Sequence, residues 1–395
     1  MIKVDDLGMN GEGIAHDQSG KAMFIPFLLP GEVWNGEHIV EVSSHRVTPK
    51  CPYYKTCGGC SLQHLSYAEA CKFKTQKVQT CMNKNGVKIE VSPCIPSEDE
   101  YFYRNKITLQ CDGEKLGLYQ IKSHKIVEIN ECKIASAEIN LAIKLIRKKL
   151  EIKNVEKIII HGKNNKIIIT INLNKNLLDK KNTDDFALAI KNNFSEFGIN
   201  FKYNNKVIKK YGVEALKICE FNINYNLDNN SFYQINDKIK NLIYLKVLSE
   251  ISVGDRVLDL YSGGGLMSAI VSQKASSVIG VEIDGFASAN AEALKKANNL
   301  TRLKNINDDC AKAILSLPAS DVVILDPPRA GCDKRVLDAL LKSKPNKIIY
   351  ISCSPQTLAR DLKILETGYK ILSVTPYDMF PQTAHVENLC VLRSC

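Results

Sequence analysis

The C-terminal half of the chain alternates short apolar runs with longer amphipathic stretches. The apolar runs are Arg256 to Leu260, Ser277 to Val281, Val322 to Leu325 and Ile348 to Ile351. Short continuous apolar runs are typical of strands buried on both faces, and the stretches between them have helical spacing. This alternation predicts an α/β domain over residues 216–395, built as a doubly wound, Rossmann-like parallel sheet.

The preceding residues follow different patterns. Residues 136–215 combine a helical stretch from Ile139 to Leu150 with apolar strands such as Lys166 to Ile171, which predicts an α+β scaffold. Residues 47–135 hold the densest cysteines, and Ser66-Tyr67-Ala68-Glu69 is a capping-box pattern that predicts a helix to about Lys84. We group residues 47–215 as a central α+β domain. Residues 1–46 are rich in glycine turns and predict a small all-β module.

The composition is that of an ordinary globular protein, with 395 residues of which 45% are hydrophobic and 24% are charged. No apolar run approaches the ~20 residues that span a bilayer, and the first residues lack a signal peptide, so we expect a cytoplasmic protein. The net charge of +10 favours a polyanionic partner, although general lysine usage also explains it. The lysines of the helix after Ser66 indicate either a solvated face or an RNA contact. They are Lys72, Lys74, Lys77 and Lys84.

A glycine turn follows the strand that begins at Arg256. Residues 257–265 are Val-Leu-Asp-Leu-Tyr-Ser-Gly-Gly-Gly, and glycines there let the backbone approach a ligand at the end of the strand. The next strand ends at Glu282, about 20 residues after the turn, where a carboxylate can accept hydrogen bonds from ribose hydroxyls. NAD and S-adenosylmethionine both satisfy this pattern.

Reactive groups are expected at the same edge of this sheet. Asp326 directly follows the strand that ends at Leu325, and Cys353 follows the next strand, where the alternative is a buried core cysteine. His385 and Glu387 lie in the last strand region, and an extended chain would place them on one face. A thiol and an acid at neighbouring strand tips favour methyl transfer over hydride transfer.

A thiol and a carboxylate together suit methylation of C5 of a pyrimidine. Addition of a thiolate to C6 makes C5 nucleophilic enough to attack a methyl sulfonium, after which a base removes the C5 proton and the thiol is eliminated. Because a free thiol with a pKa near ~8.5 is little ionised at neutral pH, we expect the site to lower the pKa of Cys353.

The chain has 14 cysteines, and clustered thiols in a reducing compartment indicate a metal or catalysis. Cys51, Cys57 and Cys60 lie close together in a glycine-containing loop, and Cys132 is a candidate fourth ligand. Four thiolates suit either zinc or an iron–sulfur cluster, and spacing alone does not choose between them.

Asp326-Pro327-Pro328-Arg329, residues 351–361 and His385-Val386-Glu387 together resemble the signature of the RNA uracil-C5 methyltransferases. The resemblance implies that Cys353 is the nucleophile, that Glu387 accepts the proton, and that Asp326 belongs to the catalytic site. The segment 231–236 resembles a Phe-x-Gln-x-Asn motif whose glutamine contacts the methyl donor. The implied S-adenosylmethionine contacts are Gln234, Tyr261, Glu282, Asp309 and Asp326.

The cysteine loop with Gln63-His64 resembles the [4Fe-4S] motif of the ribosomal RNA branch of this family. The resemblance implies a structural or RNA-positioning cluster held by Cys51, Cys57, Cys60 and Cys132. Residues 1–46 resemble the TRAM domain, an RNA-binding β-barrel. These features imply 23S ribosomal RNA as the substrate.

Alternatives remain at this point. Transfer RNA is the main one, because relatives that act on it share the catalytic motifs. RNA cytosine-C5 methyltransferases place a cysteine directly after the Asp-x-Pro motif, whereas here Arg329 follows and Cys332 comes three residues later, which favours uracil. A non-catalytic iron–sulfur RNA-binding protein is a further alternative. No pattern indicates a membrane or an obligate protein partner.

Overall fold

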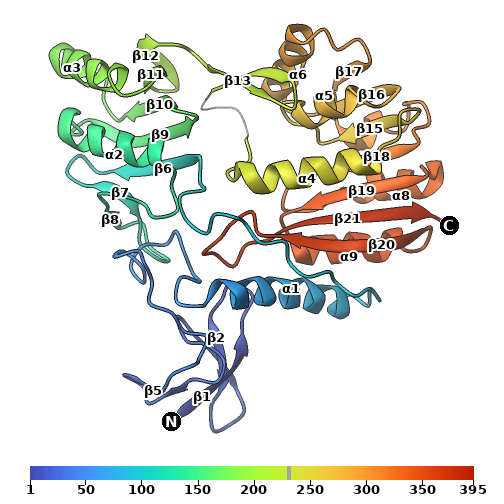
Figure 1. Ribbon diagram of the computed structural model, residues 1–395, viewed down its shortest axis with the longest axis horizontal. Coiled ribbons are helices and arrows are strands. Elements are labelled where there is room, and N and C mark those ends of the chain that lie inside the picture. The colour runs from blue at the N-terminus through green and yellow to red at the C-terminus, as the bar shows by residue number, and fades with distance from the viewer. Residues whose placement is uncertain (229–232) are drawn as a thin grey trace.

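The computed structural model describes residues 1–228 and 233–395. Its C-terminal part is built on a sheet with the strand order β17-β16-β15-β18-β19-β21-β20 (Figure 1). Strands β15 to β19 run parallel, whereas β21 is antiparallel to β19 and β20 is antiparallel to β21. The predicted Rossmann-like sheet is confirmed, with an antiparallel pair added at one edge. Its strands are β15 (Arg256–Leu260), β16 (Ser277–Glu282), β17 (Leu303–Asn307), β18 (Val322–Leu325), β19 (Lys347–Ser352), β20 (Tyr369–Tyr377) and β21 (Glu387–Ser394).

Helices cover both faces of this sheet. Alternate residues of β18 point to opposite sides, with Val323 and Leu325 in one hydrophobic core and Val322 and Ile324 in the other. The first core includes residues of α7 (Cys310–Ala313), α8 (Lys334–Ser343) and α9 (Pro355–Leu365). The second includes residues of α4 (Asp237–Glu250), α5 (Leu266–Ser272) and α6 (Gly285–Ala297).

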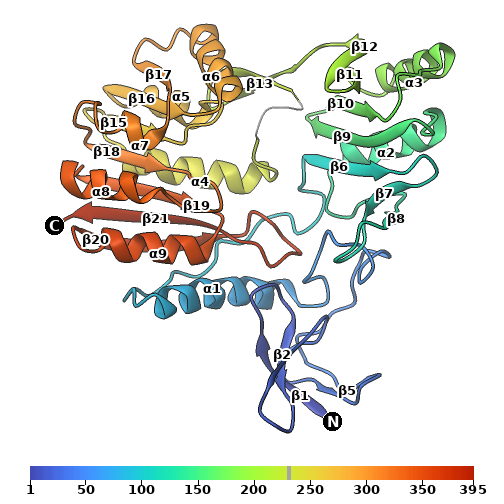
Figure 2. The ribbon, with the colours of Figure 1, turned by 180° about the vertical axis from the view of Figure 1, so that it is seen from behind.

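Helix α1 (Tyr67–Lys84) belongs by packing to the C-terminal layer, although its position in the sequence groups it with residues 47–215. Val78, Cys81 and Met82 share the core of α8 and α9. Both ribbon views show α1 lying along α9 (Figures 1 and 2). The N-terminal half of the chain therefore supplies part of one helical layer over the C-terminal sheet.

The lysines of α1 do not form a single basic face. Lys74 is fully buried and pairs with the buried carboxylate of Asp378, and Lys77 donates a hydrogen bond of 2.7 Å to the carbonyl of Ala384. Only Lys72 and Lys84 of the predicted set are exposed. The capping box also does not form: the Ser66 side chain makes no cap hydrogen bond. The expectation that all four lysines lie on a solvated or RNA-binding face was wrong, because Lys74 and Lys77 are bound inside the fold.

The central sheet has the strand order β12-β11-β10-β9-β6-β7-β8 (Figure 1). Its strands are β6 (Lys106–Cys111), β7 (Leu116–Tyr119), β8 (Ile126–Glu128), β9 (Val155–Lys163), β10 (Lys166–Leu173), β11 (Glu196–Tyr203) and β12 (Lys206–Gly212). Helices α2 (Ala137–Lys149) and α3 (Lys180–Lys191) share its apolar core. A hairpin of β13 (Leu216–Glu220) and β14 (Ile223–Leu227) follows it.

The N-terminal module is an antiparallel sheet with the order β3-β2-β1-β4-β5. Its strands are β1 (Ile2–Leu7), β2 (Gly13–His16), β3 (Ala22–Ile25), β4 (Val33–Trp34) and β5 (Ile39–Glu41). A small core of Val4, Ala15, Ile25 and Leu28 holds it together. Within residues 1–228 and 233–395, no helix is both long and apolar enough to cross a bilayer.

Candidate active site

The carboxyl edge of the C-terminal sheet borders a cavity of about 1070 Å³. Six of the candidate residues predicted from the sequence line this cavity. They are Gln234, Tyr261, Glu282, Asp326, Cys353 and Glu387. Parallel strands present their carboxyl ends at the same edge, which places the residues following β15, β18 and β19 together. Because β21 runs in the opposite direction, its first residue reaches this edge as well.

Cys353 and Glu387 lie next to each other through strand register. Ser352 of β19 pairs with Asn388 of β21, so the residue after Ser352 faces the residue before Asn388. The Asn388 side chain donates a 2.9 Å hydrogen bond to the Ser352 carbonyl, which fixes this register locally. Glu387 is 3% exposed, whereas Cys353 is only partly buried and borders the cavity.

His385 does not share the position of Glu387. The strand β21 begins at Glu387, and His385 precedes it with an exposed side chain whose ring lies 5.9 Å from that of Phe380. His385 is exposed whereas Glu387 is buried, so the two side chains have different surroundings.

The pKa of Cys353 is raised, not lowered as the sequence led us to expect. Burial is the main cause, and the neighbouring carboxyls of Glu387 and Asp326 add to it. The guanidinium of Arg329 lies close enough to the thiol to oppose this rise. The expectation failed because it counted what the reaction needs and not the desolvation and negative charge around the thiol.

Both acids of the site hold their protons more tightly than usual. Burial raises the pKa of Asp326 to about 7, and the carboxyl of Asp259 contributes. Burial also raises the pKa of Glu387 well above its ordinary value, with Asp326 adding to the rise and Arg329 opposing it. Asp326 can therefore exchange a proton near neutral pH, and Glu387 favours its protonated form.

The glycine turn leaves backbone open toward the cavity. Added Cβ atoms at Gly263 and Gly264 would meet nothing within 4 Å, and both residues line the cavity. Gly265 has a φ of 78° and lies against α6, where a Cβ would come within 2.7 Å of Ala291. Glu282 accepts backbone hydrogen bonds from Gly263 at 2.9 Å and from Asp284 at 2.7 Å. These bonds fix the carboxylate beside the turn.

Gln234 is held through its backbone. The side chain of Asn105 donates a 3.0 Å hydrogen bond to the Gln234 carbonyl, and the carbonyl of Ile235 accepts a 3.0 Å bond from the backbone N–H of Asn105. The predicted motif began at Ser231, and Ser231 and Phe232 lie outside the described residues.

Asp309 and Cys332 lie outside the main cavity. They line an adjoining cavity of about 550 Å³ that shares Tyr261 and Pro328 with the first. The Asp309 carboxylate caps α7 through a 2.7 Å bond from the backbone N–H of Ala311. Cys332 is buried and does not line the cavity of Cys353.

The four predicted metal-ligating cysteines surround another cavity, of about 200 Å³. Cys51, Cys57, Cys60 and Cys132 all line it. Burial raises the pKa of Cys60 to about 12, and it also raises the pKa values of Cys57 and Cys132. In the described part of the chain, however, no three His, Cys, Asp or Glu side chains are arranged to hold a metal ion. The thiols share a cavity without being drawn together as ligands of a single ion.

The sequence of residues 66–307 and 285–394 matches the family model described as tRNA (uracil-5-)-methyltransferase. The chain belongs to this family. The resemblance inferred from the motifs around Asp326, Cys353 and Glu387 is therefore confirmed at the level of the RNA uracil-C5 methyltransferase family.

Relatives of this methyltransferase family match nearly the whole chain. A protein of Clostridium acetobutylicum named as an uncharacterised RNA methyltransferase is 32% identical over 99% of this chain and 96% of its own length. One of Clostridium tetani with the same description is 34% identical over 90% of this chain and 85% of its own. The crystal structure of the Pyrococcus abyssi tRNA (uracil-54, C5)-methyltransferase with S-adenosyl-L-homocysteine has a TM-score of 0.81 and 25% identity, covering 99% of this chain and 100% of that one.

Two residues of this uracil-5-methyltransferase site were not assigned a role from the sequence. Arg329 was visible in the Asp-Pro-Pro-Arg motif, but its approach to the Cys353 thiol depends on the fold. Asp259 is an acid within the otherwise apolar end of strand β15, and this exception to the pattern could have marked it as a candidate site residue. It is buried against the Ser268 hydroxyl, and burial raises its pKa to about 7.

Proposed function

We propose that this chain methylates C5 of a uracil in RNA, with S-adenosylmethionine as the donor and 23S ribosomal RNA as the substrate. The observation that carries the proposal is the meeting of Cys353, Glu387 and Asp326 with Gln234, Tyr261 and Glu282 around the same cavity. At about 1070 Å³, this cavity is at the upper end of the usual size of small-molecule sites, so it has room for a donor together with a base.

The residues around the glycine turn suit the donor. A carboxylate has about four acceptor positions, and Glu282 uses two of them for backbone N–H groups. The others are free for the hydroxyls of a ribose. Gly263 and Gly264 leave space that side chains would fill. Gln234 and Tyr261 would line the donor, and Asp309 would lie at its adenine end in the adjoining cavity. Bound S-adenosylmethionine supplies an electrophilic methyl group.

The side chains of the chain itself then perform the remaining steps. A uracil that has left its stack can reach Cys353, whose thiolate adds to C6 and makes C5 nucleophilic. After C5 has taken the methyl group, Glu387 accepts the C5 proton, and the thiolate leaves C6. Arg329 favours the thiolate form that the first step needs. Asp326 lies beside Glu387 and raises its affinity for the proton.

The substrate choice is tested by mapping 5-methyluridine in ribosomal and transfer RNA from a strain without this protein. We expect one or more sites in 23S RNA to lose the methyl group, and the purified protein to restore them in vitro. Transfer RNA is the second candidate, favoured by the likeness to the Pyrococcus abyssi tRNA enzyme. Loss confined to transfer RNA would replace the ribosomal assignment, and unchanged 5-methyluridine in both RNAs would contradict the proposed function.

We propose also that Cys51, Cys57, Cys60 and Cys132 hold a [4Fe-4S] cluster. Four buried or half-buried thiols surround one cavity, and four cysteine thiolates are the ligand set of a [4Fe-4S] cluster. The reaction needs no electron transfer, so the cluster would stabilise the loop of residues 51–60 and its contact with the central sheet.

Protein purified without oxygen should therefore be brown and contain iron and sulfide in equal amounts. A Cys60→Ser variant should lose most of the iron, because one of the four thiolates is missing. Cys395→Ser is the matched control, since Cys395 is exposed at the C-terminus and should leave the iron content unchanged. Stoichiometric zinc without iron would contradict the cluster.

A further inference from the structure

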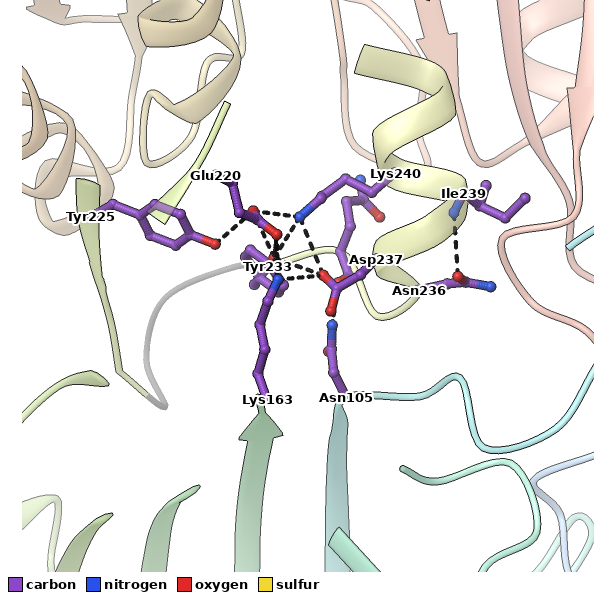
Figure 3. Close-up of polar contacts among 10 residues, drawn as sticks. Asn105, Lys163, Glu220, Tyr225, Tyr233, Asn236, Asp237, Ile239 and Lys240 are labelled. Carbon is purple, nitrogen blue, oxygen red and sulfur yellow. Dashed lines mark hydrogen bonds and ion pairs between the residues drawn. The ribbon is translucent and has the colours of Figure 1, made fainter. Parts of the chain in front are cut away.

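Charged side chains from three separate elements meet around the hydroxyl of Tyr233 in the interior (Figure 3). Lys163 comes from the end of β9, Glu220 from the end of β13, and Asp237 and Lys240 from α4. Lys163 is 7% exposed and Lys240 is 1% exposed. The central sheet, the hairpin and the C-terminal layer are therefore joined at this point by charge.

The contacts are mutual. Lys163 lies 2.9 Å from the Asp237 carboxylate and also pairs with Glu220. Lys240 lies 2.6 Å from Glu220 and 3.2 Å from Asp237. The Tyr233 hydroxyl contacts both lysines and lies 2.7 Å from Asp237 and 2.9 Å from Glu220. Two positive and two negative charges balance, so the group is neutral as a whole.

This arrangement is costly to assemble. Removing charges from water is unfavourable, and mutual attraction offsets that cost only when the geometry is good and the remaining hydrogen-bonding positions are filled. Burial on its own would raise the pKa of Asp237, but Lys240 and Lys163 lower it to about 2. A buried charged group of this kind is therefore weak evidence for added stability, and in some proteins such a group specifies one arrangement of its elements.

The residue that this group fixes is next to Gln234. The side chain of Tyr233 is bound by the charged group, and its ring lies 5.5 Å from that of the fully buried His161. On the other side, Asn105 of the central region binds the backbone of Gln234 and Ile235. Gln234 is therefore held from both directions, and its position lines the main cavity.

We infer that Lys163, Glu220, Asp237 and Lys240 act through Tyr233 as positioning residues that place Gln234 against the methyl donor. Lys163 is the last residue of β9, so the position of Gln234 in the donor site depends on the position of the central sheet. The inference rests on the proposed function, because it takes Gln234 as a donor contact.

Tyr233→Phe tests the inference, since it removes the shared hydroxyl but keeps the ring and the direct lysine–carboxylate pairs. Binding of S-adenosylhomocysteine, measured by calorimetry without RNA, should weaken about tenfold, the scale of a lost hydrogen bond to charged groups. In steady state the KM for the donor should rise by a similar factor, while kcat and the KM for RNA change less than about twofold. Lys163→Met should also weaken donor binding.

Tyr211→Phe is the matched control, because its hydroxyl binds Thr183 and Asp184 at the far side of the central sheet. It should bind the donor as wild type does. A Tyr233→Phe variant that melts at a lower temperature yet binds S-adenosylhomocysteine with wild-type affinity would overturn the inference. Wild-type protein that binds the donor but does not methylate uracil would contradict the proposed function alone, since the comparison of donor affinities would still stand.

Discussion

A Cys353→Ala variant should form no covalent complex with RNA that carries 5-fluorouridine, and its methyl transfer should fall by about 10⁴-fold or more. The thiol is the candidate nucleophile at the cavity. Without it the covalent intermediate cannot form, so the whole reaction route is lost and not only one binding contact. Fluorine at C5 cannot be removed as a proton, so the wild-type reaction should stop at the adduct. The complex is measured by denaturing gel electrophoresis and intact mass.

Cys332→Ala is the matched control for this experiment. Cys332 is a buried cysteine of the adjoining cavity and lies outside the cavity of Cys353, so its variant should still be trapped. Trapping by Cys353→Ala at the wild-type rate would remove the nucleophile assignment. Trapping lost in Cys332→Ala but kept in Cys353→Ala would move the nucleophile assignment to Cys332.

The surroundings of Cys353 affect how readily its thiol ionises for the addition to uracil. Its thiol has a raised pKa in the free chain because burial and the nearby acids disfavour the thiolate. Arg329 is the neighbouring cation that opposes them. The thiolate that would add to uracil is therefore disfavoured in the free chain, and Arg329 is the neighbouring group that favours it.

Local patterns predicted the C-terminal sheet and the placement of its reactive residues. Apolar runs located β15, β16, β18 and β19 because strands buried on both faces need continuous apolar sequence. The carboxyl-edge rule then brought Asp326 and Cys353 together without knowledge of the fold. The same reasoning could not show that β21 is reversed, which is what delivers Glu387 to Cys353.

The sequence did not predict contacts between residues that lie far apart along the chain. Lys74 looks like any helix lysine until Asp378 is placed against it by the packing of α1 on the C-terminal layer. Lys163 and Glu220 likewise lie in segments without a motif, and they are paired only because the end of β9 in the central sheet meets the end of β13 in the hairpin. The predicted direction of the Cys353 pKa shift was wrong for the same reason, since desolvation depends on neighbours that the local pattern does not specify.

A Glu387→Gln variant should accumulate a covalent, already methylated RNA adduct on natural uracil substrate, with turnover reduced by about 10²- to 10⁴-fold. Glutamine keeps the size and the buried position of the side chain, which is 3% exposed, but it cannot accept the C5 proton. Addition of Cys353 and methyl transfer do not need that proton to leave, so both should still occur.

The direction of the Glu387 shift supports this role. Burial and Asp326 raise its pKa well above the usual value, and a carboxylate that holds its proton tightly is a stronger base once it is ionised. The methylated adduct is identified by digesting the trapped complex and weighing the peptide that contains Cys353. Glu366→Gln, at the C-terminal cap of α9 and absent from the lining of the main cavity, is the control and should turn over normally. Normal turnover by Glu387→Gln would mean that another group takes the proton. The partly buried Asp326 beside it would be the first to examine, because its pKa is raised to about 7.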